Sequence, residues 1–151
     1  MPEPQYEALK LKNQGCFPLY AAARQIIKLY HPYLDPLGLT YTQYITMMVF
    51  WEEGSISVKE LGNRLFLDSG TLTPLLKVLE KKGYVTRRRW PEDERVVVAE
   101  VTPAGMALRE RVLEIPAKVA ACVPLSPQEG LQLQTLLNRL LDAGRAGGPD
   151  A

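Results

Sequence analysis

The chain has 151 residues, which fits one domain with a helical extension, and it is 46% hydrophobic and 23% charged, as in an ordinary globular protein. Its net charge of +1 gives no overall attraction to nucleic acid, so any DNA contact has to come from a local patch. No run approaches the roughly 18 apolar residues that span a membrane, the N-terminus lacks the apolar run of a signal peptide, and a single histidine without a CxxC pair argues against a metal site. We therefore expect a cytoplasmic protein without metal or cofactor, in which Cys16 and Cys122 are reduced by default and a disulfide between them would be a switch.

The N-terminal third is predicted to hold one long helix. Residues 1–10 are polar and are expected to be a flexible N-terminus. Between residues 11 and 34 the pattern is helical, and Pro18, which is best tolerated in a first turn, places the start of the main helix near Cys16 or Phe17 or kinks it there. Two prolines and a glycine then end this helix before residue 39.

Two shorter helices are predicted next, each from a capping signal. Thr40 and Gln43 fit the capping box, so a helix should run from Tyr41 to about Glu53, and it is apolar on most sides and therefore buried. A second capping box at residues 57–60 opens a short helix to about residue 66. The link to the next helix is short, as in a helix-turn-helix.

The stretch from residue 67 to residue 95 is predicted to form a helix and a two-stranded ribbon. One helix face carries leucines at the spacing i, i+3, i+4, i+7, namely Leu72, Leu75, Leu76 and Leu79. The opposite face is small, polar and basic, with Thr73, Pro74, Lys77 and Lys81. Asp68 or Ser69 can cap the start, and Gly83 suits the position after the end.

The ribbon adds a concentration of positive charge. Residues 84–90 read as a strand, residues 91–94 as a turn and residues 95–101 as the return strand. Between Lys77 and Arg95, seven cationic and four acidic side chains leave a net charge of +3, above the +1 of the whole chain. A basic helix face beside an arginine-bearing hairpin is typical of a winged helix-turn-helix that binds DNA, although a helix and hairpin with a merely solvated charged face also occur in other small α+β domains.

Further helices are predicted after the ribbon. Thr102 and Pro103 form an N-cap signal for a long helix. Pro116 should kink this helix, or residues 117–123 form a separate turn. The run that starts at Ser126 repeats the signal for a last, leucine-rich helix. Residues 144–151 are expected to be a disordered tail.

A homodimer is predicted from the apolar terminal helices. The predicted dimerisation helices, at about 11–34 and 103–143, carry more apolar surface than the winged helix-turn-helix between them, at about 40–101, can bury. The prediction is a mainly α protein with a small β wing, one domain over residues 11–143, that binds a pseudo-palindromic double-stranded DNA operator as a dimer. The alternative is a monomer whose terminal helices pack on its own core.

Three motifs resemble those of a known family. Asp93-Glu-Arg95, four residues and then Glu100-Val-Thr-Pro-Ala-Gly105 resemble the wing signature of the MarR family of winged-helix regulators. The runs Leu67-Asp-Ser-Gly-Thr-Leu-Thr-Pro-Leu-Leu-Lys77 and Asn13-Gln-Gly-Cys-Phe-Pro-Leu-Tyr20 resemble its organic-hydroperoxide-sensing branch, OhrR. The resemblance covers roughly residues 11–141 and implies a homodimeric repressor, not an enzyme.

The resemblance implies that Cys16 senses organic hydroperoxide. A thiolate is the reactive form, a helix N-terminus favours it, and oxidation gives a sulfenate. The residues alone favour a buried, unreactive cysteine at this position. The family pattern also implies that Tyr30 and Tyr41 hydrogen-bond the sulfur from the partner subunit, with core packing as the alternative. Cys122 lies in the region where some members carry a second cysteine, which resolves the sulfenate as an intersubunit disulfide, and the alternative is an inert apolar cysteine.

DNA contacts are predicted from the helix and the wing. The residues on or near the presented part of the helix are Ser69, Thr71, Thr73, Pro74 and Lys77. Arg95 would enter the minor groove with Asp93 orienting it, as the motif implies. Arg87, Arg88 and Arg89 would bind phosphate or brace the wing, but alternation along a strand prevents all three from facing DNA.

Two other functions compete with this prediction. A repressor of the same fold could respond to a phenolic or lipid ligand in the dimer cleft, with incidental cysteines. A thiol peroxidase could turn over peroxide with Cys16 and Cys122, but no acid–base or arginine constellation is evident, and the wing would have no role.

Overall fold

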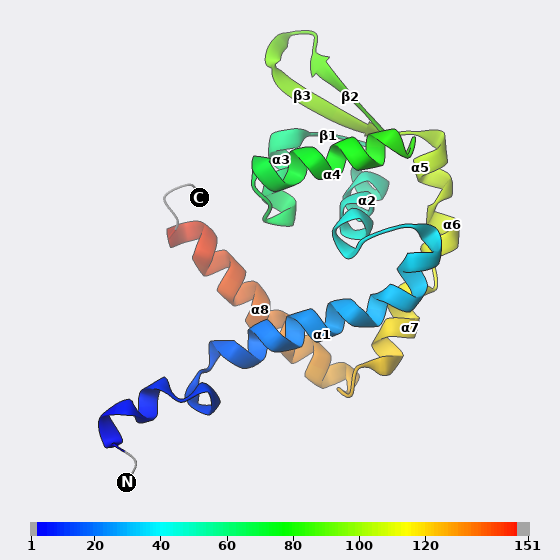
Figure 1. The fold of residues 1–151 in the computed structure, drawn as a ribbon. Coiled ribbons are helices and arrows are strands. Elements are labelled where there is room, and N and C mark those ends of the chain that lie inside the picture. The colour runs from blue at the N-terminus through cyan, green and yellow to red at the C-terminus, as the bar shows by residue number, and fades with distance from the viewer. Residues whose placement is uncertain (1–2, 148–151) are drawn as a thin grey trace. The chain divides into compact units, whose positions relative to one another are not determined.

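Helices dominate the fold, and a small sheet projects from them (Figure 1). The computed structural model describes residues 3–147, with side chains through Arg145. The chain divides into two compact units, Met1–Val119 and Ala120–Ala151, each of which is described by itself. The elements are η1 (Pro4–Leu9), η2 (Leu11–Asn13), α1 (Cys16–Leu34), η3 (Asp35–Leu37), α2 (Tyr41–Glu53), β1 (Ser55–Ser57), α3 (Val58–Leu65), α4 (Ser69–Lys81), β2 (Val85–Trp90), β3 (Asp93–Val101), α5 (Pro103–Ala107), α6 (Arg109–Val112), α7 (Ile115–Cys122) and α8 (Pro127–Gly147).

The core of the first unit is built around α2. Its start is fixed as predicted, because the Gln43 N–H donates to Thr40 Oγ1 and the Thr40 N–H donates to Gln43 Oε1, both at 3.2 Å. The middle of the helix is fully buried, with Met47 and Phe50 at 0% exposure. The four leucines of the predicted α4 stripe face the same core. Burial of such side chains, at roughly 1.5–3 kcal/mol each, is the main stabilisation of this unit.

Both ends of α4 are closed by local hydrogen bonds. The Asp68 carboxylate accepts from the Thr71 N–H at 2.7 Å, and this bond lowers the pKa of Asp68. At the other end Gly83 has a left-handed φ of +82°, and the N–H groups of Gly83 and Tyr84 donate to the carbonyls of Glu80 and Leu79. This is the Schellman arrangement, in which glycine is favoured because it adopts a left-handed φ without the steric penalty of a Cβ. Both ends of α4, the helix predicted to contact DNA, are therefore fixed by local hydrogen bonds.

The sheet has three strands rather than the predicted two. The order is β1-β3-β2, all antiparallel, and β1 pairs with β3 through Ile56 and Ala99. β1 was missed because three residues are too short for a periodic signal, and its last residue, Ser57, is also the N-cap of α3, where it accepts from the Glu60 N–H at 3.1 Å. The β2–β3 hairpin is the wing, with a register shift between Arg89 and Trp90.

Helices after the wing are shorter than predicted. Instead of one long helix there are α5 and α6, separated at Leu108, and α7 begins at Ile115, just before Pro116. Leu108, Val112 and Ile115 are buried in the core of the first unit. The breaks between α5, α6 and α7 change the direction of the chain, so that all three side chains face the same core.

Gly105 fixes the approach of α5 to the wing base. A Cβ at this position would collide with the Tyr84 carbonyl oxygen and lie 2.8 Å from Val101 Cγ2. The Gly105 carbonyl accepts from Trp51 Nε1 at 2.9 Å, which joins α5 to α2. Only glycine allows this packing.

Two predictions concern the chain ends. Residues 4–9 and 11–13 form exposed 3-10 turns within the segment predicted to be flexible and just after it. In the second unit, Ser126 and Glu129 form the predicted capping box, and α8 continues to Gly147, so residues 144–147 are helical rather than disordered. The rest of the predicted tail, residues 148–151, lies outside the described residues.

Among residues 3–147, no helix is both long enough and apolar enough to cross a membrane.

Candidate functional site

The exposed face of α4 carries most of the residues predicted to contact DNA. Ser69, Thr71, Pro74 and Lys77 are exposed, and Thr73 is half-buried. α4 begins at Ser69, so Pro74 lies inside the helix and not in its first turn, where a proline is best tolerated. Its missing N–H leaves the Gly70 carbonyl without an intrahelical donor, and because this side of the helix is open, water can replace the donor.

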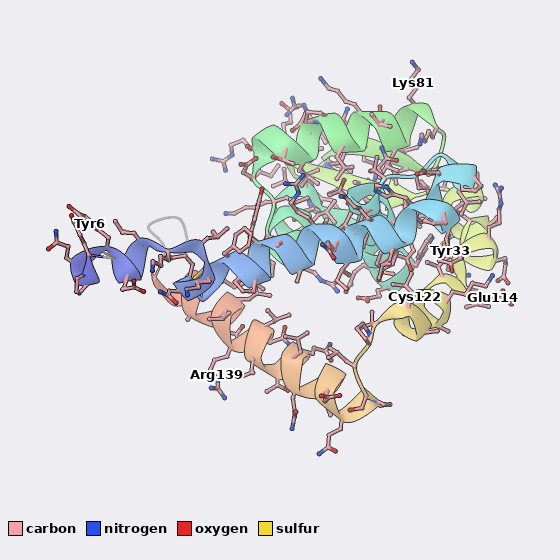
Figure 2. The ribbon with its side chains drawn as sticks, turned by 60° about the horizontal axis from the view of Figure 1, so that its bottom comes forward. Tyr6, Tyr33, Lys81, Glu114, Cys122 and Arg139 are labelled. Atoms are coloured by element: carbon pink, nitrogen blue, oxygen red, sulfur yellow. The ribbon has the colours of Figure 1, made fainter. Side chains whose placement is uncertain are left out.

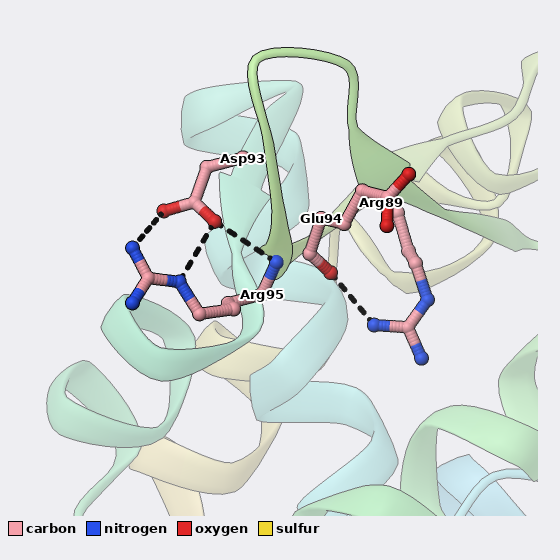
Figure 3. A network of polar contacts seen from close by, with 4 residues as sticks. All are labelled: Arg89, Asp93, Glu94 and Arg95. Atoms are coloured by element: carbon pink, nitrogen blue, oxygen red, sulfur yellow. Dashed lines mark hydrogen bonds and ion pairs between the residues drawn. The ribbon is translucent and has the colours of Figure 1, made fainter.

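The three consecutive wing arginines have different environments. Arg87 is half-buried and pairs with Glu80 of α4 at 2.6 Å, so it braces the wing against the recognition helix. The Arg88 guanidinium lies 5.9 Å from the ring centroid of Trp90. Arg89 donates to the Glu94 carbonyl across the hairpin at 2.7 Å (Figure 3). Arg88 and Arg89 are exposed, so this geometry fits the expectation that the three arginines do not share one role.

Arg95 is oriented by Asp93 near the tip of the wing. Its Nε and its backbone N–H donate to Asp93 Oδ1 at 3.1 and 3.0 Å, and its Nη2 donates to Oδ2 at 3.2 Å (Figure 3). These bonds lower the pKa of Asp93, so the carboxylate is charged at neutral pH. The Arg95 side chain is nevertheless 91% exposed, so its orientation is set while its guanidinium remains accessible.

The base of the wing is joined to the end of α4 through Thr102. Its hydroxyl donates to the Gly83 carbonyl at 2.6 Å and accepts from the Gly105 N–H at 3.0 Å. The threonine and the glycine of the wing motif therefore fix one corner, at which α4, the wing and α5 meet.

The two cysteines lie in different units. Cys16 is the first residue of α1, and Gly15 before it supplies no side-chain cap, so the amide dipoles of the first turn point toward the region of the sulfur. Cys122 is the last residue of α7 (Figure 2). Both side chains are exposed, which differs from the buried, inert cysteine that the residues alone favoured at position 16.

Tyr30 and Tyr41 are brought together, and a third tyrosine completes the cluster. The ring centroids of Tyr30 and Tyr41 are 4.8 Å apart, and the Tyr44 ring is 5.8 and 6.3 Å from them. Burial raises the pKa of all three phenols, for Tyr44 to about 12, so they remain proton donors at neutral pH. Within residues 3–147, the Tyr30 and Tyr41 hydroxyls make no hydrogen bond. Two half-buried donors are thus open to a partner from outside this chain.

Sequence reasoning missed the polar contacts of Lys82, which caps α4. Its ammonium donates to the Gly38 carbonyl and, at 3.3 Å, to Gln43 Oε1. Contacts across about 40 residues of sequence leave no local signal, so no pattern could have revealed them.

Large apolar side chains remain exposed on both terminal helices. On α1 they are Phe17, Leu19, Tyr20, Ile26 and Ile27, and on α8 they are Leu131, Leu133, Leu136, Leu140 and Leu141. Among residues 127–145 of this helix, none is buried. In residues 3–147 no group of three or more His, Cys, Asp or Glu side chains could hold a metal ion.

The known proteins that this chain resembles are transcriptional regulators. The family model described as transcriptional regulator SarA/Rot matches residues 28–112. The chain is 42% identical over 140 residues to the organic hydroperoxide resistance transcriptional regulator of Bacillus subtilis, covering 93% of this chain and 95% of that protein. The structure of reduced AbfR bound to DNA, a protein of Staphylococcus epidermidis, has a TM-score of 0.78 at 32% identity and covers 94% of this chain and 97% of that one. Disulfide-formed AbfR has a TM-score of 0.64 at 34% identity over 91% and 96% of the two chains.

Proposed function

The chain belongs to the SarA/Rot family of winged-helix transcriptional regulators, and on that premise we propose that it is a DNA-binding repressor which organic hydroperoxides release from its operator by oxidising Cys16. The MarR-type, OhrR-like resemblance that the motifs predicted is confirmed by the family model and the relatives. The family consists of regulators and not of enzymes, which sets aside the thiol peroxidase.

The observation that carries the proposal is the incomplete polar site at the tyrosines. Tyr30 and Tyr41 present open phenol donors, and Cys16 presents an exposed sulfur at a helix N-terminus. A thiolate is a strong acceptor for a phenol O–H, and each group lacks what the other offers. We place the Cys16 sulfur of one protomer against Tyr30 and Tyr41 of its partner.

Oxidation would remove the acceptor. The Cys16 thiolate attacks the outer oxygen of the hydroperoxide, the O–O bond breaks, and the alkoxide takes a proton to leave as the alcohol. The sulfenic acid that remains is neutral when protonated and differs in shape from the thiolate. The Tyr30 and Tyr41 bonds to the sulfur are then lost, which gives the change in DNA affinity a physical cause.

Cys122 would resolve the oxidised sulfur. Its thiolate attacks the Cys16 sulfenic acid, a disulfide forms between protomers, and the hydroxyl leaves as water after taking up a proton. The exposure of Cys122 at the end of α7 supports this role, because a buried thiol could not reach a partner. Disulfide-formed AbfR is a precedent in a similar protein and not in this one.

The DNA-binding role rests on the recognition helix and the wing. The exposed α4 face, with Ser69, Thr71, Pro74 and Lys77 and with Thr73 beside them, would enter the major groove. Arg95, held by Asp93, would enter the minor groove, and Arg88 and Arg89 would contact phosphates while Arg87 braces the wing. A homodimer would present two such surfaces to a pseudo-palindromic operator.

The exposed leucines of α8 and the apolar side chains of α1 support dimerisation. Contiguous apolar faces of this kind mark protein interaction sites, since a soluble chain rarely leaves them in water. A dimer also supplies the second chain that the site of Cys16, Tyr30 and Tyr41 requires.

The proposal is tested by operator release. The reduced protein would first select an operator duplex from random sequence, and binding of wild type, Cys16→Ser and Cys122→Ser would then be measured before and after cumene hydroperoxide, with hydrogen peroxide as the comparison. We expect wild type to be released, Cys16→Ser to stay bound, and Cys122→Ser to be released only when a small external thiol is present. Peroxide-driven release of Cys16→Ser would overturn the sensing role. Release of Cys16→Ser by a simple phenol or a fatty acid would instead support the ligand-responsive alternative.

A further inference from the structure

Lys82 lies where the recognition helix meets the segment that carries Tyr41. It is the C-cap residue of α4, directly before the left-handed Gly83. Its ammonium reaches back to the start of α2, where it donates to the Gly38 carbonyl in the preceding loop and to Gln43 Oε1 in the first turn of the helix. These contacts join positions that are 44 and 39 residues apart in the sequence.

The acceptors of Lys82 belong to the structure that positions Tyr41. Gln43 Oε1 also accepts from the Thr40 N–H, so the same oxygen serves the capping box and the lysine. Gln43 is 7% exposed, and its amide is therefore held by these bonds and not by water. Tyr41 is the first residue of α2, between Thr40 and Gln43, so a displacement of its ring moves the backbone that Lys82 holds.

On its other side, Lys82 is attached to the surface that would contact DNA. The Gly83 carbonyl accepts from Thr102, which ties the end of α4 to the base of the wing. Glu80 pairs with Arg87 of β2, which ties the same turn of α4 to the wing a second time. A displacement of Lys82 would therefore move the end of α4 and the wing together.

We propose that Lys82 is a positioning residue that transmits the state of the tyrosine site to the recognition helix. It touches neither the reacting sulfur nor the DNA face, and it acts by holding the Gly38–Gln43 turn against the end of α4. When the phenols lose their acceptor, the turn shifts, and the ammonium carries the shift to the corner of α4 and the wing. This inference rests on the proposed function, since it assigns a route for the same response.

The neighbouring lysine provides a matched control. Lys81 has the same charge and is one residue away, but its side chain points away from the fold (Figure 2), and it makes no hydrogen bond or ion pair within residues 3–147. Lys81→Met removes one positive charge beside the DNA face without touching the turn. It should alter operator affinity equally in both redox states and leave their ratio unchanged.

The test measures the ratio of operator affinities before and after cumene hydroperoxide. We expect Lys82→Met to bind the operator in the reduced state within a few-fold of Lys81→Met, and its ratio to shrink by about 2- to 30-fold, the range in which residues along a coupling route act. Lys82→Arg, which retains charged donors of similar reach, should restore the ratio. Thermal unfolding of all three variants separates this effect from a loss of fold.

A double-mutant cycle with Tyr41→Phe identifies the route. If the lysine transmits the state of the tyrosine, Tyr41→Phe lowers operator affinity less in the Lys82→Met background than in the wild type. A ratio in Lys82→Met equal to that of wild type overturns the role of Lys82 and leaves the peroxide response standing. A wild type that stays on the operator after oxidation overturns the proposed function and this inference together.

Discussion

The recognition segment, residues 68–95, and the proposed sensor site, Cys16, Tyr30 and Tyr41, differ in how many of their polar groups find partners within one chain. Three carboxylates in the recognition segment already have partners, since Asp68 caps α4, Glu80 holds Arg87 and Asp93 holds Arg95. In the sensor site the phenols of Tyr30 and Tyr41 have none within residues 3–147, and the Cys16 side chain is exposed.

This difference separates a preorganised surface from a conditional one. Groups that are already oriented lose little side-chain freedom when they bind, so the recognition segment can keep its geometry in every state of the protein. A site whose donors wait for an outside acceptor has its energy set by that acceptor. The two regions should therefore respond differently to substitution, the first in its affinity for DNA and the second in the response to peroxide.

The largest effect is expected from breaking the frame of the recognition segment. Gly105→Ala places a methyl group against the Tyr84 carbonyl and 2.8 Å from Val101 Cγ2. Because backbone has to move, we expect a loss of about 3 kcal/mol in the free energy of unfolding. Urea unfolding followed by tryptophan fluorescence, to which Trp51 and Trp90 both contribute, measures it. A midpoint equal to that of Gly144→Ala, where a Cβ meets nothing within 4 Å, would contradict the packing argument.

A smaller effect is expected when one preorganised side chain is removed. Arg95→Ala should weaken operator binding by about 1–3 kcal/mol, because the guanidinium is exposed and already oriented by Asp93. The loss should be equal in the reduced and oxidised protein, since the sensor site is untouched. Binding titrations at fixed salt test this, and a loss confined to one redox state would blur the separation of the two regions.

The reverse pattern is expected for the sensor site. Tyr30→Phe combined with Tyr41→Phe removes both open hydroxyls and keeps the packed rings, whose centroids lie 4.8 Å apart. We expect the reduced protein to lose about 1 kcal/mol of operator affinity, as the thiolate loses its donors, and to respond less to cumene hydroperoxide. Tyr6→Phe, at an exposed tyrosine of η1, is the control. An unchanged response in the double variant would remove the phenols from the mechanism.

The features that could be predicted from the sequence are those set by residues close together in the chain. Capping boxes at Thr40 and Ser126, the Asp68 cap and the leucine stripe of α4 are each read from residues within one or two turns, and the structure contains them all. β1 escaped because Ile56 becomes a strand residue only by pairing with Ala99, far along the chain.

Long-range contacts explain the remaining differences. Tyr44 reads as a buried α2 residue, and its place in a tyrosine cluster depends on how α1 packs on α2. The bonds of Lys82 to Gly38 and Gln43 depend on how the end of α4 packs against the start of α2. The roles of Cys16 and Cys122 stay predictions, because they require a second chain.

The smallest effect concerns the proton on a phenol of the cluster. The pKa of Tyr44 is raised by burial and by Tyr30 and Tyr41 to about 12 in the folded protein, from an ordinary value of 10.0. The folded state therefore holds its proton more tightly, and this contribution to stability is present below pH 10 and lost as the pH rises toward 12. Between pH 10 and 12, the urea midpoint of Tyr44→Phe should fall less steeply with pH than the midpoint of the wild type. Tyr6→Phe is the control. An equally steep decline in both variants would contradict the assignment.

The short third strand divides the wing along its length. β1 pairs only with Val98–Glu100 of β3, so at the base of the hairpin β3 has a neighbour on both edges. Toward the tip β3 pairs with β2 alone, through Val97 with Arg89 and, beyond the register shift, through Asp93 with Trp90. Backbone amides at the base should therefore exchange slowly with deuterium and those toward the tip quickly. Arg95 lies toward the tip, so the Asp93–Arg95 pair would move with the tip as one unit, keeping its own geometry, while the base keeps its register.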